Sequence, residues 1–395
     1  MHILIIPSWY PSDKEDISGS FFREQAIALS RRGCKVGVIS LQLRLLQNFH
    51  RAILDSRKIS HVLDNGVNTY RKTGVKWFPV FPRLHAGYCR YYGLRLFERY
   101  ARSHGRPDVV HVQSMSNAGP IAQAIYREHG IPYVVTEHLS SLGRALGSGK
   151  LDELRTIASD AHRRLAVSSV FAKLLESTLG EAVGPWEVMP NIVSDCFFSP
   201  PVRRQKNDRF SFISISLLSE NKRVDLIIRS FTRAFGGKPL FRLCIVGEGN
   251  TRSSLERLVR ELGVSEQVYF LGRLTREQVI KEISASDVLV LGSDFETFGI
   301  VLIEALALGK PVLATRCGGP EDIVSEGDGI LIPKGDPDAM ATAMKIIYNN
   351  YTSYNPEKLR NSCRLRFGES TVVDKIIKIF DEAVSERGPL KLTRL

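Results

Sequence analysis

The sequence predicts an α/β protein of two domains, each built around a parallel sheet. Its 395 residues suffice for two domains of roughly 200 residues each. Along the chain, short apolar runs alternate with segments of helical periodicity, which is the order of repeated β-α-β units. Near the middle, residues 194–209 are rich in proline and charge and lack periodicity, which is typical of a linker.

The first half contains short apolar runs that predict strands, each followed by a turn or a helical pattern. Gly33 follows the first helical pattern directly, at a position where helices commonly end. We expect ligand-binding side chains just after the strands, because parallel sheets bind ligands at the carboxyl ends of their strands. The predicted strands are residues 3–6, 36–39, 109–112, 133–136 and 165–167, and the predicted helices are 21–32 and 120–129.

The second half repeats this order. Its first apolar run comes directly after the linker, and its final helical pattern carries apolar residues on one face. The predicted strands are residues 210–215, 243–246, 268–271, 287–291, 312–315 and 329–332, and the predicted helices are 224–235, 276–285, 298–308, 336–349 and 371–386.

One carboxylate lies inside the helix predicted at 298–308, which is apolar on nearly all faces. An ionised and unpaired Glu304 would cost several kcal/mol there. Two interpretations follow. Either a neighbouring arginine pairs with Glu304, or Glu304 accepts hydrogen bonds from vicinal hydroxyls of a ligand, such as those of a ribose.

The start of the same helix is a candidate phosphate site. Phe298, Gly299 and Ile300 place backbone N–H groups at a helix N-terminus, an arrangement that attracts anions. Glu296 precedes them in a polar loop. Diphosphate at the amides, ribose at Glu304 and a sugar hydroxyl at Glu296 would together describe a sugar nucleotide.

These residues form a long ordered pattern. Glu296-x7-Glu304 with Ala305, then Gly309-Lys310-Pro311-Val312 and Gly318-Gly319, resembles the signature of the GT4 family of retaining glycosyltransferases. The resemblance implies the GT-B fold, in which two Rossmann-like domains face each other across a cleft. It extends from Gly19 to the final helix. The implied boundaries are 1–195 for an acceptor-side domain, 205–370 for a nucleotide-sugar domain, and 371–395 for a helix that crosses back to the first domain.

The resemblance implies transfer of a sugar from a nucleotide-diphosphate sugar to an acceptor hydroxyl, with retention at the anomeric carbon, no metal ion and no other cofactor. By position it assigns catalytic roles to His138, Glu296 and Lys222. The donor-binding residues that it implies are Gly19, Asn191, Arg223, Gly247, Gly249, Arg273, Phe298, Gly299, Ile300 and Glu304.

The sequence departs from the family pattern at two places. Gly19-Ser20 stands where members usually have two glycines facing the diphosphate. In the G-R-L-x-x-x-K pattern Lys222 matches the lysine, but Ser216 and Leu217 replace the glycine and the arginine. One phosphate-binding cation is therefore missing, and Arg223 is the candidate substitute.

Two other positions follow the family more closely. His138 ends a predicted strand, where members carry a histidine that contacts the donor sugar. Ser168 resembles a serine that caps the next helix, and Asn191 belongs to a Pro-Asn motif expected to face the cleft. Without the resemblance, a single histidine at a strand end would more often be structural.

Composition and charge restrict the remaining classes. Six scattered cysteines without a Cys-x-x-Cys pair argue against a zinc site and a disulfide framework, and fit a reducing cytoplasm. The apolar run at 3–6 is too short for a signal-peptide core, and no run approaches the length of a membrane span. The net charge of +12 favours an anionic partner.

The basic and aromatic stretch 83–106 also has two interpretations. It is either a helix that packs its aromatic residues inward with arginines in solvent, or a surface that docks on anionic lipid or a lipid-linked acceptor. The acceptor is expected to be a sugar or lipid-linked glycan. No recognised nucleic-acid module accompanies the charge. The location is expected to be cytoplasmic, either free or peripheral on the inner face of the membrane.

Three functions stay open at this point. The first is an active transferase, with bacterial surface-polysaccharide or lipopolysaccharide assembly as the expected pathway. The second is a GT-B relative with another activity, such as a sugar-nucleotide epimerase or a phosphorylase. The third is a non-catalytic subunit that binds sugar nucleotide, which Leu217 in place of arginine keeps open. The sequence does not name the sugar, the base or the acceptor.

Overall fold

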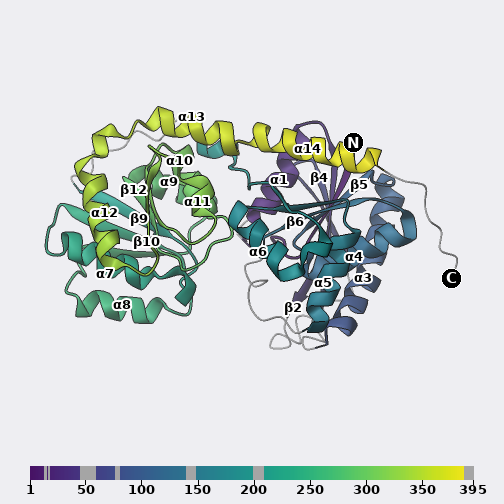
Figure 1. Cartoon of the computed structure of the whole chain (residues 1–395), viewed down its shortest axis with the longest axis horizontal. Coiled ribbons are helices and arrows are strands. Elements are labelled where there is room, and N and C mark those ends of the chain that lie inside the picture. Colours follow the sequence, from purple (N-terminus) through teal and green to yellow (C-terminus); the bar gives the residue numbers. More distant parts are fainter. Residues whose placement is uncertain are drawn as a thin grey trace. The chain divides into compact units, whose positions relative to one another are not determined.

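The computed structural model describes residues 1–12, 16, 18–44, 59–75, 81–138, 148–198 and 209–386. The chain divides into two compact units (Figure 1). The first comprises Met1–Ile192 together with the described residues from Val372 on, and the second comprises Val193–Thr371. Each unit is an α/β domain with its own sheet and its own apolar core.

Within the described residues, the first unit has an eight-stranded sheet in the order β3-β4-β2-β1-β5-β6-β7-β8. Neighbouring strands are parallel except for the β3–β4 hairpin. In register, Ile5 pairs with Val38 on one side and with His111 on the other. The strands are β1 (His2–Pro7), β2 (Lys35–Arg44), β3 (Ile59–Asp64), β4 (Val67–Val75), β5 (Val109–Gln113), β6 (Tyr133–Glu137), β7 (Arg163–Ala166) and β8 (Glu187–Val188).

Helices cover this sheet. They are α1 (Ser20–Arg31), α3 (Pro82–His104), α4 (Met115–His129), α5 (Ser148–Asp160) and α6 (Ser169–Leu179). The last helix, α14 (Glu369–Ser385), adds an apolar stripe of Val372, Ile376 and Phe380, four residues apart in turn. These side chains are fully buried in one cluster with Ile3, Ile5 and Phe22. Helix α14 is therefore part of the first unit's core. Burial of each of these side chains contributes about 1.5–3 kcal/mol to its stability.

The second unit has, in the described residues, a six-stranded parallel sheet in the order β11-β10-β9-β12-β13-β14. The chain first builds outward from β9 to β11, and then returns to the other side of β9 with β12. Ligands of such sheets bind at the carboxyl ends of the strands where the order reverses, here β9 and β12. The strands are β9 (Phe210–Ile215), β10 (Phe241–Val246), β11 (Val268–Gly272), β12 (Val288–Leu291), β13 (Val312–Thr315) and β14 (Gly329–Ile332).

The helices of the second unit follow the predicted positions, with three additions. Helices α8 and α13 and the single-turn helix α11 were not predicted, whereas α7 and α9 have the predicted bounds. The helices are α7 (Val224–Phe235), α8 (Arg252–Glu261), α9 (Arg276–Ala285), α10 (Ile300–Ala307), α11 (Pro320–Ile323), α12 (Pro337–Asn349) and α13 (Pro356–Phe367). Most of the predicted linker, residues 199–208, lies outside the described residues.

The basic stretch 83–106 forms helix α3, and its aromatic residues divide between two environments. Phe97 and Tyr100 are buried, and Tyr88 and Tyr92 are half-buried. Tyr91 is 55% exposed on the same helix. The described part of the chain contains no helix that is both long enough and apolar enough to cross a bilayer.

Candidate active site

Lys222 and Glu296 meet at the reversal point of the second sheet. Lys222 follows β9 in a single helical turn, and Glu296 follows β12. Lys222 Nζ lies 2.5 Å from Glu296 Oε1, which also accepts a hydrogen bond from Ser293 Oγ at 2.7 Å. Two of the three predicted catalytic residues are therefore in direct contact. Ser293, which the sequence analysis did not select, holds the carboxylate from the other side.

The loop that carries Glu296 is held by the glycine pair of the predicted motif. Glu296 N donates to Cys317 O, and Gly319 N donates to Glu296 O, each at 2.9 Å. A Cβ on Gly319 would lie 2.2 Å from Phe298 Cα, and one on Gly318 would lie 2.5 Å from Glu296 O. The glycines are thus needed for close packing of two loops, which positions the Glu296 carboxylate.

Helix α10 begins directly after this loop. Gly299 has φ +100° and precedes the first helical residue, Ile300, while the Phe298 side chain is buried within the second unit. The first amides of a helix have no intrahelical acceptor, and the helix dipole adds positive potential there. The start of α10 can therefore bind an anion, and it follows closely in the sequence after Glu296, which contacts Lys222.

Glu304 pairs with an arginine, the first of its two interpretations. Its side chain is 2% exposed, and Arg276 at the start of α9 donates from Nη1 to Glu304 Oε1. Burial raises the pKa of Glu304, and the adjacent Arg276 guanidinium partly offsets this effect. Arg276 also stacks over the Phe197 ring at 4.4 Å. A contact between Glu304 and a ligand hydroxyl stays a prediction.

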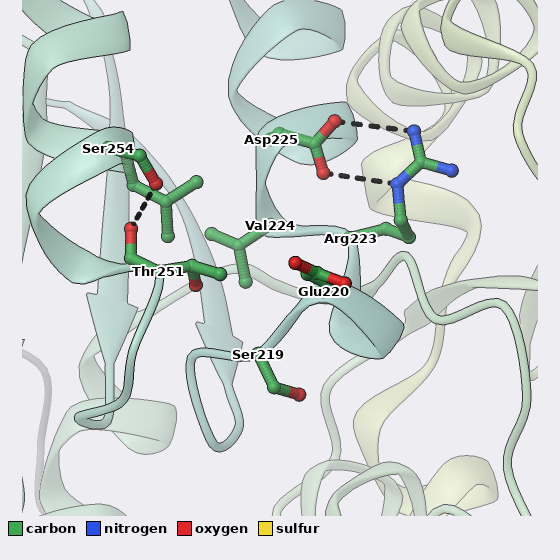
Figure 2. A pocket seen from close by; sticks show the side chains of 8 residues that line it. Ser219, Glu220, Arg223, Val224, Asp225, Thr251 and Ser254 are labelled. Carbon is green, nitrogen blue, oxygen red and sulfur yellow. Dashed lines mark hydrogen bonds and ion pairs between the residues drawn. The ribbon is translucent and has the colours of Figure 1, made fainter.

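Arg223, the predicted substitute for the missing arginine, is engaged by two other carboxylates. Its Nε and Nη2 donate to Asp225 at 3.1 and 3.3 Å, and its Nη1 donates to Asp294 at 3.3 Å. Figure 2 shows the guanidinium turned toward Asp225. These two carboxylates balance its charge, and a contact between Arg223 and a phosphate stays a prediction. Leu217, at the position of the family's arginine, is 64% exposed.

A pocket of about 320 Å³ lies beside the loop between β9 and α7, which carries Arg223 (Figure 2). It opens between the starts of α7 and α8, and neither Lys222 nor Glu296 lines it. Its walls carry hydroxyl groups, two carboxylates and one guanidinium. The lining residues are Ser219, Glu220, Arg223, Val224, Asp225, Thr251, Ser254 and Leu255.

The Gly247-Glu248-Gly249 turn has a packing reason for its glycines. A Cβ on Gly247 would lie 1.9 Å from Ser216 O, and one on Gly249 would lie 2.0 Å from Leu218 O. Gly247 N donates to Gly272 O at 2.8 Å, which joins this turn to the end of β11. The exposed Arg273 follows at once. The predicted base-side residues therefore lie together at the carboxyl edge of the sheet.

His138 lies in the first unit, at the carboxyl end of β6. Its side chain is 8% exposed and packs against the rings of Phe21 and Phe22, with centroids at 5.3 and 4.9 Å. Its Nε2 lies 2.7 Å from Gln113 Oε1. Burial lowers the pKa of His138 to about 3, and the nearby His111 adds a smaller effect. The imidazole is thus neutral at physiological pH.

Glu137, next to His138, supports the backbone. Its two carboxylate oxygens accept hydrogen bonds from Met115 N and His138 N, both at 2.9 Å. Ser114 Oγ accepts a further hydrogen bond from His138 N at 3.3 Å, and Ser114 itself has a positive φ of 64°. Strained residues of this kind concentrate at functional sites.

The remaining predicted residues of the first unit have structural surroundings. Gly19 precedes α1 with φ +75°, and a Cβ there would lie 2.9 Å from Trp9 Cδ1. Ser168 caps α6 by accepting from Phe171 N at 3.2 Å, as predicted. Asn191 is buried three residues after β8.

Two family models match this chain. The model described as Glycosyltransferase Family 4 matches residues 18–195, and the one described as Glycosyl transferases group 1 matches residues 198–365. The chain belongs to the family 4 glycosyltransferases. Its fold is GT-B, with two α/β units, as the resemblance implied.

Curated relatives of this family 4 glycosyltransferase match it over part of their length. An exopolysaccharide phosphotransferase of Streptomyces coelicolor is 30% identical over 64% of this chain, and this chain covers 26% of it. A GDP-mannose-dependent phosphatidylinositol monomannoside mannosyltransferase of Mycolicibacterium smegmatis is 29% identical over 57% of this chain, which covers 62% of that protein. The chain therefore spans less than two thirds of either relative.

Solved structures match the family 4 glycosyltransferase over nearly its whole length. Sucrose-phosphate synthase from Thermosynechococcus elongatus aligns with a TM-score of 0.79 at 20% identity, covering 97% of this chain and 99% of its own. Anabaena HepE in complex with UDP aligns with a TM-score of 0.74 at 19% identity, covering 97% and 100%. At these identities the likeness is one of fold.

Proposed function

We propose that this protein transfers a sugar from a nucleotide-diphosphate sugar to an acceptor hydroxyl, with retention of the anomeric configuration. One observation carries the proposal. A lysine and a glutamate are in contact at the reversal point of a parallel sheet, and the glutamate lies in the loop that leads to the start of α10. This places a cation, a carboxylate and free helical amides where such sheets bind nucleotides.

The proposed chemistry follows from these charges. The α10 amides and Lys222 bind the diphosphate, and they stabilise the charge that develops as the sugar–phosphate bond breaks. Glu296 accepts a hydrogen bond from a sugar hydroxyl. Because Lys222 contacts Glu296, it also screens this carboxylate from the anionic diphosphate. The proposal needs no metal ion, and undiminished turnover in EDTA would support that part.

We propose same-face attack rather than a covalent intermediate on Glu296. Both Lys222 and Ser293 bond to Glu296 Oε1, which lowers the nucleophilicity of the carboxylate. The acceptor oxygen then attacks the anomeric carbon as the phosphate leaves on the same face, and a phosphate oxygen takes the acceptor proton. His138, neutral at pH 7, contributes a hydrogen bond to the sugar rather than a proton.

The donor is tested first. Thermal-shift screening against UDP, GDP, ADP and their sugar conjugates measures binding, because a ligand that binds only the folded state raises the unfolding midpoint. One base that stabilises clearly identifies the donor class. Incubation of that donor with candidate acceptors, followed by NMR of the anomeric proton, then tests transfer and retention. An inverted product would overturn the same-face mechanism.

The proposed pathway is assembly of a bacterial surface polysaccharide or lipopolysaccharide, with a sugar or lipid-linked glycan as acceptor. The names of the Streptomyces and mycobacterial relatives, an exopolysaccharide enzyme and a phosphatidylinositol mannoside enzyme, support this class. The exposed face of α3 supports peripheral membrane binding, since Arg90, Arg95 and Arg99 lie in solvent with Tyr91.

Membrane binding has a matched test. The variant Arg95→Glu/Arg99→Glu should lose sedimentation with phosphatidylglycerol vesicles, because it reverses two charges of α3. The control Arg257→Glu/Arg260→Glu makes the same change in net charge on exposed positions of α8. Equal sedimentation of both variants would leave only the interpretation of α3 as a solvated helix.

A second candidate function is a non-catalytic subunit that binds sugar nucleotide. The observation that favours it is the exposed Leu217 in the loop where the family has an arginine, together with the balanced charge of Arg223. Nucleotide binding without transfer or donor hydrolysis would favour this candidate. An epimerised donor would instead favour a third one, a sugar-nucleotide epimerase.

A further inference from the structure

A buried chain of hydrogen bonds leads to the side chain of His138. Gln113, at the end of β5, is fully buried, and its Oε1 lies 2.7 Å from His138 Nε2. Its Nε2 contacts Gln25 Oε1 on α1 and lies 3.3 Å from His111 Nδ1. His111 Nε2 in turn lies 2.8 Å from Thr136 Oγ1. One amide thus joins three other side chains at the carboxyl edge of the first sheet.

The orientation of the Gln113 side-chain amide determines which ring nitrogen of His138 carries the proton. Gln113 Nε2 can only donate, and it faces two acceptors, Gln25 Oε1 and His111 Nδ1. Its Oε1 can only accept, so His138 must donate from Nε2. Neutral His138 therefore carries its proton on Nε2, and Nδ1 is left as an acceptor.

The surroundings of the other ring nitrogen, His138 Nδ1, support the same orientation of the Gln113 amide. Within the described chain, His138 Nδ1 is buried and has no hydrogen-bond partner. If the Gln113 amide were reversed, Nδ1 would carry a proton and become a buried donor without an acceptor. Orphaned buried N–H groups are rarer than orphaned acceptors, because a buried donor without an acceptor loses its hydrogen bond to water with no replacement.

We propose that Gln113 is the positioning residue of His138: it holds the imidazole as the Nε2-protonated tautomer and leaves Nδ1 to accept a hydrogen bond from a ligand hydroxyl. The last part rests on the proposed function, since the hydroxyl is that of a sugar. Gln25 and His111 act through Gln113 by fixing its amide.

The surroundings explain why one amide can control this ring. Phe21 and Phe22 pack against the imidazole, and Glu137 and Ser114 hold His138 N. The ring position is thus set by packing, while Gln113 supplies the one hydrogen bond to the side chain among the described residues. Removing that acceptor frees the tautomer without removing the packing.

The test is the tautomer itself, measured by two-bond ¹H–¹⁵N NMR of the full chain labelled at histidine. The His138 signals are assigned by their loss in His138→Gln. We expect the pattern of an Nε2-protonated ring in the parent and in Gln113→Glu, which keeps an acceptor oxygen. Gln113→Leu should lose that pattern. Gln123→Leu is the matched control, because Gln123 is also a buried glutamine but bonds to Asp160 at 2.8 Å.

Kinetics give a second measurement. Gln113→Leu should lower kcat about tenfold with the Kd for nucleoside diphosphate unchanged, and Gln113→Glu should recover part of the loss. A parent His138 protonated on Nδ1, or an unaltered NMR pattern in Gln113→Leu, overturns the positioning role. The NMR result does not depend on turnover. An inactive enzyme with the expected tautomer would therefore contradict only the proposed transferase function.

Discussion

Lys222 Nζ and Glu296 Oε1 lie 2.5 Å apart, joining the loop after β9 to the loop after β12. These loops follow the two strands at which the order of the second sheet reverses. The pair is half-buried, with side-chain exposures of 24% and 11%. If the donor binds here as proposed, mutation of either partner of this partly desolvated ion pair should alter catalysis.

Replacing Lys222 should reduce turnover more than tenfold. Lys222→Ala removes the cation proposed to bind the diphosphate, and it leaves Glu296 without its counter-ion. Lys222→Arg should retain more activity, because it keeps the charge. Steady-state kinetics with the donor identified by thermal shift measure both variants. Parent-like rates in Lys222→Ala would show that this lysine does not bind the leaving group.

Replacing Glu304 separates its two interpretations. If Glu304 accepts ribose hydroxyls, Glu304→Ala should raise the nucleotide Kd about tenfold, a loss of about 1.4 kcal/mol. If it only pairs with Arg276, the variant should be less stable but bind nucleotide as the parent does. Isothermal titration calorimetry with nucleotide and thermal unfolding together distinguish the two interpretations. We expect Glu304→Ala to bind nucleotide more weakly than the parent.

Removing the partner of Glu304 tests the burial of this carboxylate. Arg276→Met should destabilise the protein by about 3 kcal/mol, because it leaves a carboxylate that is 2% exposed without its counter-ion. Denaturant unfolding at pH 7 measures the effect. The raised pKa of Glu304 predicts that the loss shrinks as the pH falls, since the protonated form needs no partner.

Two buried histidines predict a stability loss in mild acid. Burial lowers the pKa values of His111 and His138 to about 3, whereas unfolded histidine has a pKa near 6.5. Between these values the unfolded chain binds more protons, so stability falls as the pH decreases below about 6.5. Each histidine contributes about 1.4 kcal/mol per pH unit in that range. In denaturant unfolding from pH 7.5 to 5, His138→Gln should show a shallower slope than the parent.

The glycine pair of the second unit predicts a steric effect. In Gly319→Ala the new Cβ would lie 2.2 Å from Phe298 Cα, so the loop carrying Glu296 must move. We expect a loss of about 1–3 kcal/mol together with weaker donor binding. Gly87→Ala on α3 is the control, because nothing lies within 4 Å of its Cβ and alanine favours a helix. Equal unfolding midpoints of the two variants would contradict the packing argument.

Sequence patterns predicted the second sheet well because its strands are short apolar runs, and the four strands inside the sheet are largely buried on both faces. Strands β9, β13 and β14 have the predicted bounds. The β3–β4 hairpin was missed. Most of β3 is exposed at the sheet edge, so its residues do not form an apolar run. Helix α13 was also missed, since its apolar residues are few among charged ones.

The site was predictable as a set of residues but not as a set of contacts. The family pattern selected Lys222 and Glu296 separately, and no spacing in the sequence indicates that they touch. Ser293 and Gln113 were missed because a serine or glutamine at a strand end has many structural uses. Gln113 meets His138 because β5 pairs with β6, and Lys222 meets Glu296 because β9 pairs with β12.

Helix α14 makes the order of synthesis differ from the order of folding. The first unit needs Val372, Ile376 and Phe380 to cover Ile3 and Ile5, yet these residues leave the ribosome after the whole second unit. Until then a nascent first unit exposes an apolar face, while the second unit, Val193–Thr371, is already complete. A chain stopped before α14 would keep that face bare, so it is expected to require chaperones or to aggregate.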